Sequence, residues 1–292
     1  MRAPHDSSTD ALPTPGPRDR HGLYERAVQD PAADVAVVER VLRRFEQPAR
    51  RLREDFSGTA ALAASWVERG PERTAVAVDL DPSVHAWART YRIPSLGDAA
   101  ARLRLVNADV REAPRERFDA VVALNFSYGV FRTRAALRGY LRSARAALAP
   151  GGVLMLDAFG GWDAQKELVE RRRIGSGVTY VWEQERFDPV THGIRCAIHF
   201  EFARGRPMRR AFEYDWRLWS LPELTELLGE AGLVDVEVLW DVASGPSRYL
   251  PRASARNQAG WIAYVIGRRR VRTPAPASEG SPRRRPARGR EW

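Results

Sequence analysis

Cysteine, lysine and long apolar runs are scarce in this chain of 292 residues. Its single cysteine, Cys196, excludes an intramolecular disulfide and a metal site built on a cysteine cluster. No stretch approaches the roughly 18 to 20 continuous apolar residues that cross a bilayer, and no apolar segment of a secretory signal opens the chain. The sequence therefore predicts a cytoplasmic protein without a membrane segment or a bound metal.

Positive charge is concentrated at the C-terminal end. The chain carries a formal charge of +10, and residues 268–292 hold nine arginines against two glutamates, a net +7 that leaves about +3 for the rest. Such a tail binds RNA or DNA through phosphate contacts, or it is a solvated extension. No aromatic residues alternate with its arginines to stack on bases, which favours the second interpretation.

Residues 1–20 and 269–292 have no apolar periodicity, and we expect a disordered N-terminal arm and a disordered basic tail. The segment between them, 21–268, is expected to fold as one domain. Its first part alternates helical patterns with apolar strands. Helices are expected after Asp30-Pro31, over 60–67, after Asp81-Pro82 with His85 on the helix surface, and over 134–148; strands are expected over 52–56, 74–78, 103–109, 118–125 and 153–159.

This alternation is typical of an α/β fold with a doubly wound, mostly parallel, seven-stranded Rossmann-like sheet. From about residue 162 to 219 the pattern changes to aromatic and β-branched runs, which predict three antiparallel strands inserted as a lid. Ser220 opens a capping-box helix, and 234–240 and 260–267 are expected to close the domain as strands.

Three carboxylates stand at the ends of predicted strands. Glu54 precedes the turn Ser57-Gly58-Thr59, Asp79 ends the second strand, and Asp109 follows the third. The carboxyl ends of parallel strands meet at one edge of a sheet, where ligands bind. A nucleoside needs backbone amides near a glycine turn and carboxylates for its hydroxyl and amine donors.

Five stretches at these positions resemble the motifs of the class I S-adenosylmethionine-dependent methyltransferases, in the family's order. They are LREDFSGTAALAASWV, TAVAVDLDPSV, LVNADVRE, FDAVVALNFSYGVF and LAPGGVLMLD. The resemblance extends from about residue 22 to 267. The chain departs from it in the glycine loop, where Phe56 and Ala60 replace two of three glycines and only Gly58 remains. A single glycine also argues against NAD, which is bound by G-x-G-x-x-G.

The resemblance implies S-adenosyl-L-methionine as the cofactor. By similarity, Glu54 and Gly58 line its methionine end, Asp79 binds the ribose hydroxyls, and Asp109 contacts the adenine amine with Val110 beside the ring. The full set of expected cofactor contacts is Glu54, Ser57, Gly58, Asp79, Leu80, Asp109, Val110, Asn125 and Tyr24.

Catalytic candidates follow the fourth strand. Asn125 and Tyr128 lie where ALNFSYGVF resembles the loop of small-molecule N-methyltransferases; Tyr128 either positions a nucleophile or packs under the lid. Tyr24 either closes over the cofactor or docks a helix. His199, in the predicted lid, is a candidate general base or a strand residue with a satisfied partner.

The lid also carries aromatic residues. Tyr214 and Trp216 share one strand face, because alternate residues of a strand point the same way. Such a face either stabilises a sulfonium or packs the lid.

The sequence predicts an S-adenosylmethionine-dependent methyltransferase acting on a small molecule. One alternative is an RNA or protein methyltransferase guided by the basic tail. Another is a non-catalytic binding module that keeps the fold, suggested by the reduced glycine loop. The oligomeric state and the acceptor atom are not indicated by the sequence.

Overall fold

The computed structural model describes residues 12–113, 116–242 and 249–271. Most of the expected N-terminal arm and basic tail, residues 1–11 and 272–292, lies outside them. Within the described ranges, no helix combines the length and the apolar character needed to cross a membrane.

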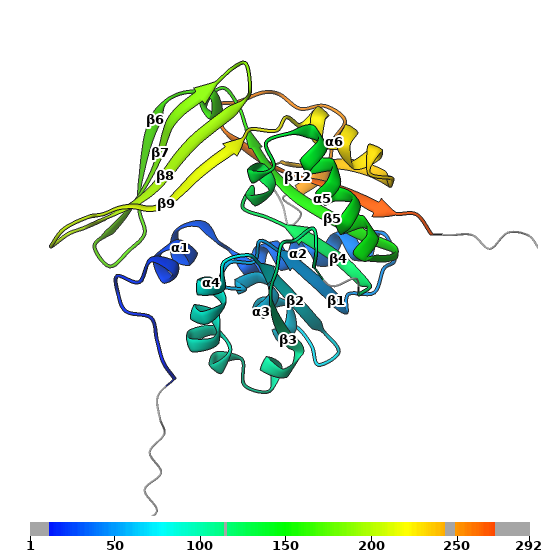
Figure 1. Cartoon of the computed structure of the whole chain (residues 1–292), viewed down its shortest axis with the longest axis horizontal. Helices are drawn as coiled ribbons and strands as arrows, with labels where there is room; N and C mark the ends of the chain where they lie inside the picture. The colour runs from blue at the N-terminus through cyan, green and yellow to red at the C-terminus, as the bar shows by residue number, and fades with distance from the viewer. Residues whose placement is uncertain (1–11, 114–115, 243–248, 272–292) are drawn as a thin grey trace, which may run out of the picture.

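A central sheet of eight strands organises the molecule (Figure 1), in the order β11-β10-β12-β5-β4-β1-β2-β3. Neighbours from β5 to β3 are parallel, whereas β12 runs antiparallel to both β5 and β10. The strands are β1 (Arg51–Asp55), β2 (Thr74–Asp79), β3 (Leu103–Asn107), β4 (Phe118–Ala123), β5 (Leu148–Gly160), β10 (Leu233–Asp241), β11 (Tyr249–Pro251) and β12 (Trp261–Arg269). The predicted fold class is confirmed, with the three-residue edge strand β11 added to the seven expected.

The helices begin where the sequence places capping residues. Asp30 accepts a hydrogen bond from the Ala33 amide at the start of α2, and Ser220 and Glu223 form the predicted capping box. Such caps satisfy amides that have no partner inside the helix. The helices are α1 (Arg20–Val28), α2 (Pro31–Arg44), α3 (Ala61–Glu68), α4 (Pro82–Trp87), α5 (Arg134–Ala147) and α6 (Leu221–Glu230), with shorter turns η1 (Ala88–Arg92), η2 (Pro94–Arg102), η3 (Ser127–Val130) and η4 (Asp163–Gln165).

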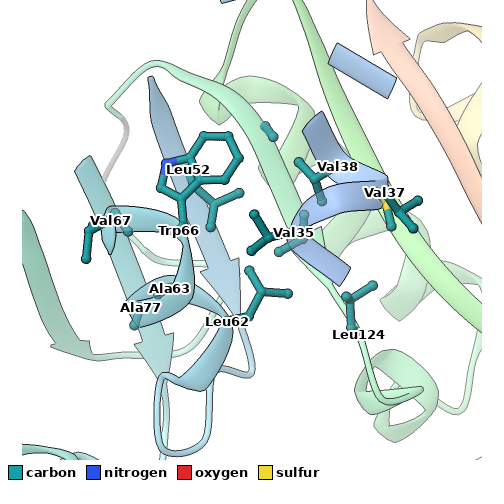
Figure 2. Close-up of a cluster of buried hydrophobic side chains, with 14 of the residues drawn as sticks. Val35, Val37, Val38, Leu52, Leu62, Ala63, Trp66, Val67, Ala77 and Leu124 are labelled. Carbon is teal, nitrogen blue, oxygen red and sulfur yellow. The ribbon is translucent and has the colours of Figure 1, made fainter. Parts of the chain in front are cut away.

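Both faces of the sheet are covered. Figure 2 shows part of one apolar core, where Val35 and Val38 of α2 and Trp66 of α3 pack around Leu52 of β1. The opposite core is made by α5 and α6 against β4 and β5. Burial on two faces explains why the strands read as apolar runs without polar alternation.

The inserted segment folds as a second, four-stranded antiparallel sheet, which we call the lid sheet, in the order β6-β7-β8-β9. Its strands are β6 (Leu168–Arg173), β7 (Val178–Asp188), β8 (Gly193–Phe202) and β9 (Met208–Arg217). The sequence predicted three strands and missed β6, an edge strand whose LVERRR sequence is largely exposed and lacks the expected alternation. Figure 1 shows the lid sheet beside the central sheet, with α1 near it. Leu23 and Ala27 of α1 pack on Ile198 and Phe200 of the lid sheet.

Candidate functional site

The turn after β1 keeps the shape of a glycine loop with fewer glycines. Phe56, Gly58 and Ala60 all have left-handed backbone angles, with φ of 56°, 53° and 58°. These are the positions where the resembled family has glycines, and a Cβ makes this conformation costly. Phe56 is held by ring contacts to Phe131 and Tyr140. The loop conformation is therefore retained even though two of its glycines are lost.

Glu54, the last residue but one of β1, is buried. One of its carboxylate oxygens accepts a hydrogen bond of 2.8 Å from the Ala63 amide of α3. Burial raises the pKa of Glu54 to about 8, assisted by the negative charges of Asp34 and Asp79. Near neutral pH this carboxyl is therefore largely protonated, and a cation beside it would favour its ionised form.

A small cavity, which we call the acidic cavity, adjoins Glu54. Gln29, Asp34 and Asn125 are among its other lining residues. The Gln29 side-chain oxygen is buried and has no hydrogen-bond partner among the described residues. Burial also raises the pKa of Asp34 to about 6, although Tyr264 donates a hydrogen bond to it at 2.8 Å. The acidic cavity thus offers hydrogen-bond acceptors to a ligand that carries donors and positive charge.

Asp79 joins β2 to the glycine loop. Its carboxylate accepts hydrogen bonds from the amides of Gly58, at 2.8 Å, and Asp81, at 2.9 Å. A carboxylate has about four acceptor sites, so it retains capacity for ligand hydroxyls. The next residue, Leu80, leaves 71% of its surface exposed, which is unusual for a large apolar side chain at a strand end.

The expected surface position of His85 is wrong. His85 is fully buried, and its Nε2 lies 3.1 Å from the hydroxyl oxygen of Ser57 in the glycine loop. Burial lowers the pKa of His85, which favours the neutral ring. The short helix α4 packs the side that carries His85 against the glycine loop. The local sequence gives no signal of this tertiary contact.

Asp109 stands apart from the other two carboxylates. It forms a two-pronged ion pair with Arg111, with nitrogen–oxygen distances of 2.9 Å and 2.6 Å. Val110 beside it is buried, and its carbonyl accepts a hydrogen bond of 2.6 Å from Arg53. Asp79 therefore contacts the glycine loop and Glu54 contacts α3, whereas Arg53 of β1 fixes the turn at Asp109 and Val110.

Arg53 explains the polar character of β1. Arg53 and Asp55 point to the same side of the strand and form a buried ion pair of 2.6 Å. Tyr140 of α5 donates a further hydrogen bond of 2.9 Å to Asp55. The sequence analysis missed this pair, whose signal is the i, i+2 spacing of opposite charges.

A cavity of about 530 Å³, which we call the large cavity, lies between the lid sheet and the carboxyl end of the central sheet. The predicted residues Tyr24 and Asn125 line it, as do the predicted pair Tyr214 and Trp216, whose ring centroids are 4.2 Å apart. Its other lining residues include the aromatic Phe126, Phe159, Tyr180, Trp182, Tyr249 and Trp261 and the acidic Asp163, Glu170 and Asp241. The cavity walls are thus aromatic, with carboxylates among them.

His199 faces away from the large cavity, a placement that matches the second of its two expected roles, a strand residue with satisfied partners, rather than a general base. Ile198, its neighbour on β8, lines the cavity, and alternate strand residues point to opposite faces. Both ring nitrogens of His199 have protein partners. Nε2 lies 2.8 Å from the Glu183 carboxylate, and Nδ1 accepts a hydrogen bond of 2.9 Å from the Arg210 amide. This is the geometry of a strand histidine with satisfied partners.

Tyr128 is also buried, and its hydroxyl donates a hydrogen bond of 2.7 Å to the backbone carbonyl of Asp157. It lies outside the lining of the large cavity, so the packing interpretation matches its placement.

Helix α1 lies over the glycine loop. Glu25 accepts hydrogen bonds from the Thr59 hydroxyl and, at 2.5 Å, from Arg92. Asp19 accepts another, of 2.8 Å, from the Trp87 indole. The first helix therefore closes the site from the side of α4.

Residues 57–154 match a family model described as a methyltransferase domain. The fold is similar to a S-adenosylmethionine-dependent methyltransferase of Clostridium acetobutylicum, with 15% identity over 85% of this chain and 97% of that one and a TM-score of 0.64. It is also similar to the CcbJ methyltransferase of Streptomyces caelestis, with 17% identity, coverage of 84% and 98%, and a TM-score of 0.65.

A third similar structure is the sugar N-methyltransferase KedS8 of Streptoalloteichus, with 24% identity, coverage of 92% and 100%, and a TM-score of 0.61. No curated protein sequence matches the chain. Residues 57–154 are a methyltransferase domain, and the chain around them has the fold of the S-adenosylmethionine-dependent methyltransferases.

Proposed function

We propose that this protein transfers a methyl group from S-adenosylmethionine to an amine of a small molecule bound in the large cavity. One observation carries the proposal: Asn125 lines both the acidic cavity and the large cavity. A methyl donor at Glu54 and an acceptor under the lid sheet therefore meet at this residue.

The acidic cavity, about 10 Å³ in volume, has room for the ammonium group of S-adenosylmethionine but not for the rest of its methionine end. That end carries an ammonium group, and Glu54, Asp34 and the unpartnered oxygen of Gln29 are acceptors for it. An ammonium beside Glu54 favours the ionised carboxylate and releases its proton. Asp79 would then bind the ribose hydroxyls, and Asp109 would contact the adenine amine with Val110 beside the ring, as the resemblance implies.

The large cavity suits an amine. The carboxylates of Asp163, Glu170 and Asp241 outnumber the one cationic residue in the described lining, Arg172, although Asp163 pairs with Lys166 at 2.6 Å. Aromatic faces such as those of Tyr214 and Trp216 also attract cations. The neighbour KedS8 is a sugar N-methyltransferase, and another similar structure, CalS10 of Micromonospora echinaspora, is an amino pentose methyltransferase. Both names support an amine acceptor here.

When bound, S-adenosylmethionine supplies a methyl group already activated by its sulfonium. An amine bound as its cation must first lose a proton to solvent; its lone pair would then form the new carbon–nitrogen bond as the carbon–sulfur bond breaks and S-adenosylhomocysteine leaves, and the positive charge would pass to the methylated nitrogen. The chain's residues align the two reactants and exclude water, which is the main demand of such a displacement. The lid sheet, α1 and the turn at Asn125 provide this enclosure.

Calorimetry with S-adenosylmethionine tests the donor site. We expect binding with proton release at pH 8, and at least about tenfold weaker binding by Glu54→Gln, because a hydrogen bond to a charged group contributes roughly 1.5–3 kcal/mol. A second assay follows transfer of labelled methyl to a panel of free amino sugars and arylalkylamines, with the matching alcohols as controls. A wild-type protein that does not bind S-adenosylmethionine contradicts the proposal.

Neither a non-catalytic module nor an RNA or protein methyltransferase is favoured by the domain match and the structural neighbours. The cytoplasmic location stays a prediction from the sequence.

A further inference from the structure

Two consecutive residues after β4 have a costly backbone conformation. Asn125 and Phe126 both have left-handed angles, with φ of 57° and 59°. Asparagine tolerates this region, but a bulky residue such as phenylalanine adopts it at a cost of about 1–3 kcal/mol unless its surroundings enforce it. Both residues line the large cavity, so the conformation of this turn sets the shape of the cavity floor.

Asp157 of β5 enforces that conformation. One oxygen of its carboxylate accepts a hydrogen bond of 2.8 Å from the Asn125 amide, and the other accepts one of 2.9 Å from the Phe126 amide. Only 7% of Asp157 is exposed. The Tyr128 hydroxyl donates to the Asp157 carbonyl, so the next part of the segment is fixed to the same residue.

We propose that Asp157 is a positioning residue of the methyl-transfer site, holding the Asn125–Phe126 turn where the donor and acceptor cavities meet. The proposal rests on the proposed function for its catalytic consequence. Its geometric part, the two hydrogen bonds that one carboxylate accepts from successive amides, does not depend on that function. Asp157 lies outside the lining of both cavities and acts through the turn.

The strength of these two hydrogen bonds depends on the charge of Asp157. Burial, assisted by the nearby carboxylate of Asp34 on α2, raises its pKa to about 7, although the two amides lower it. The other titratable groups facing it are the hydroxyls of Tyr24 on α1, Tyr128 after β4 and Tyr264 on β12. Protonation removes the charge and occupies one oxygen with a proton, so that the two amides no longer share a charged acceptor. The turn therefore loosens as the pH falls through about 7.

Amide hydrogen exchange tests this in the full chain. In the wild type, the protection factors of the 125 and 126 amides, corrected for intrinsic exchange, should fall at least about tenfold from pH 8 to pH 6, because a charge-assisted bond is roughly twice as strong as a neutral one. Asp157→Asn should have low protection at both pH values. The wild-type measurement needs no variant, so it decides the proposal even if Asp157→Asn folds poorly.

Asp119 supplies a matched control. Its buried carboxylate also accepts two successive amides, those of Arg50 and Arg51, at the opposite end of the sheet. Asp119→Asn should lose comparable stability but keep the protection of 125 and 126. Asp157→Asn should keep S-adenosylmethionine binding within about twofold and lower kcat for the best amine of the panel by about 10–100-fold, as misplaced reactants do.

Equal protection of these amides in Asp157→Asn and the wild type overturns the proposal, and so does a kcat loss no larger than that of Asp119→Asn. If the wild type neither binds S-adenosylmethionine nor methylates any amine, the proposed function fails. The exchange data still decide whether Asp157 holds the turn.

Discussion

At the scale of single residues, buried charges in the first strand distinguish this chain. Arg53 and Asp55 are 1% exposed each, in a strand that is paired on both sides by β2 and β4. A buried ion pair contributes little net stability, but removing one partner leaves an uncompensated charge. Arg53 also donates a hydrogen bond to the carbonyl of Val110, so it fixes the turn at Asp109 and Val110 as well as pairing with Asp55.

Arg53→Met should lower the free energy of unfolding by about 3–5 kcal/mol, since Asp55 is left buried without its partner. The double variant Arg53→Met/Asp55→Asn should recover a large part of this loss. The control is Arg51→Met, which breaks the half-exposed pair with Glu116 and should cost less than about 1 kcal/mol. Urea unfolding measures all three, and equal losses for Arg53 and Arg51 would contradict the argument.

Glu54 gives a pH-dependent prediction. Its pKa is about 8 in the folded chain and 4.5 in the reference state, so the folded state binds more protons between these values. Stability is therefore greatest below pH 4.5 for this group and falls as the pH rises to about 8. Glu54→Gln removes this dependence and should stabilise the cofactor-free protein at pH 9 by at least about 1 kcal/mol, the value of roughly one pKa unit.

Thermal unfolding of the cofactor-free protein at pH 5 and pH 9 measures this effect. Glu223→Gln is the control of opposite sign, because hydrogen bonds from Ser220 and the charge of Arg217 lower the pKa of Glu223 despite its partial burial. That variant should destabilise the protein at neutral pH. A Glu54→Gln variant that is less stable than the wild type at pH 9 would show that Glu54 has a purely structural role.

At the scale of elements, the glycine loop contains strain that a substitution can remove. Ala60 has φ of 58° immediately before α3, where a Cβ costs roughly 1–2 kcal/mol. Ala60→Gly should raise the free energy of unfolding by about 0.5–1 kcal/mol after the entropy of the unfolded glycine is counted. Ala63→Gly, inside the same helix, should lower it by about 1 kcal/mol. Equal losses of stability in Ala60→Gly and Ala63→Gly would contradict the argument that Ala60 is strained.

The same elements show what sequence alone predicts. The strands from 74 to 159 and the capped helices were predicted because burial periodicity and caps such as Asp30 are local signals. The edge strands β6 and β11 were missed because an exposed or three-residue strand carries neither signal. In the candidate site, Glu54 and Asn125 were expected from the family's motifs and Tyr24 from the segment that precedes them, and their contacts with a ligand stay predictions.

The residues that sequence reasoning missed or misplaced depend on contacts distant in sequence. His85 reaches Ser57 across 28 positions, and Asp157 reaches Asn125 across 32. The two alternatives for His199 stayed open because one strand offers two faces, and only the packing of the sheet decides which of them lines the cavity.

At the scale of the whole molecule, the described structure divides the basic C-terminal end into two parts. Arg268 pairs with Asp235 at 2.7 Å, and Arg269 donates a hydrogen bond of 2.5 Å to the Leu148 carbonyl, so both belong to the sheet. Strand β12 ends at Arg269, within the segment that the sequence assigned to a tail. Removing residues from 269 onward would therefore disturb the sheet as well as the charge.

A truncation after Val271 separates the two effects, because it removes residues 272–292, with six arginines and two glutamates, and leaves β12 intact. If the substrate is a small amine in the large cavity, kcat/KM should stay within about twofold of the full chain at both 50 and 200 mM salt, since no phosphate contacts are lost. A nucleic-acid substrate instead predicts a loss that is large at low salt and shrinks at high salt. Methyl transfer to the best amine, and in parallel to total RNA, distinguishes these outcomes.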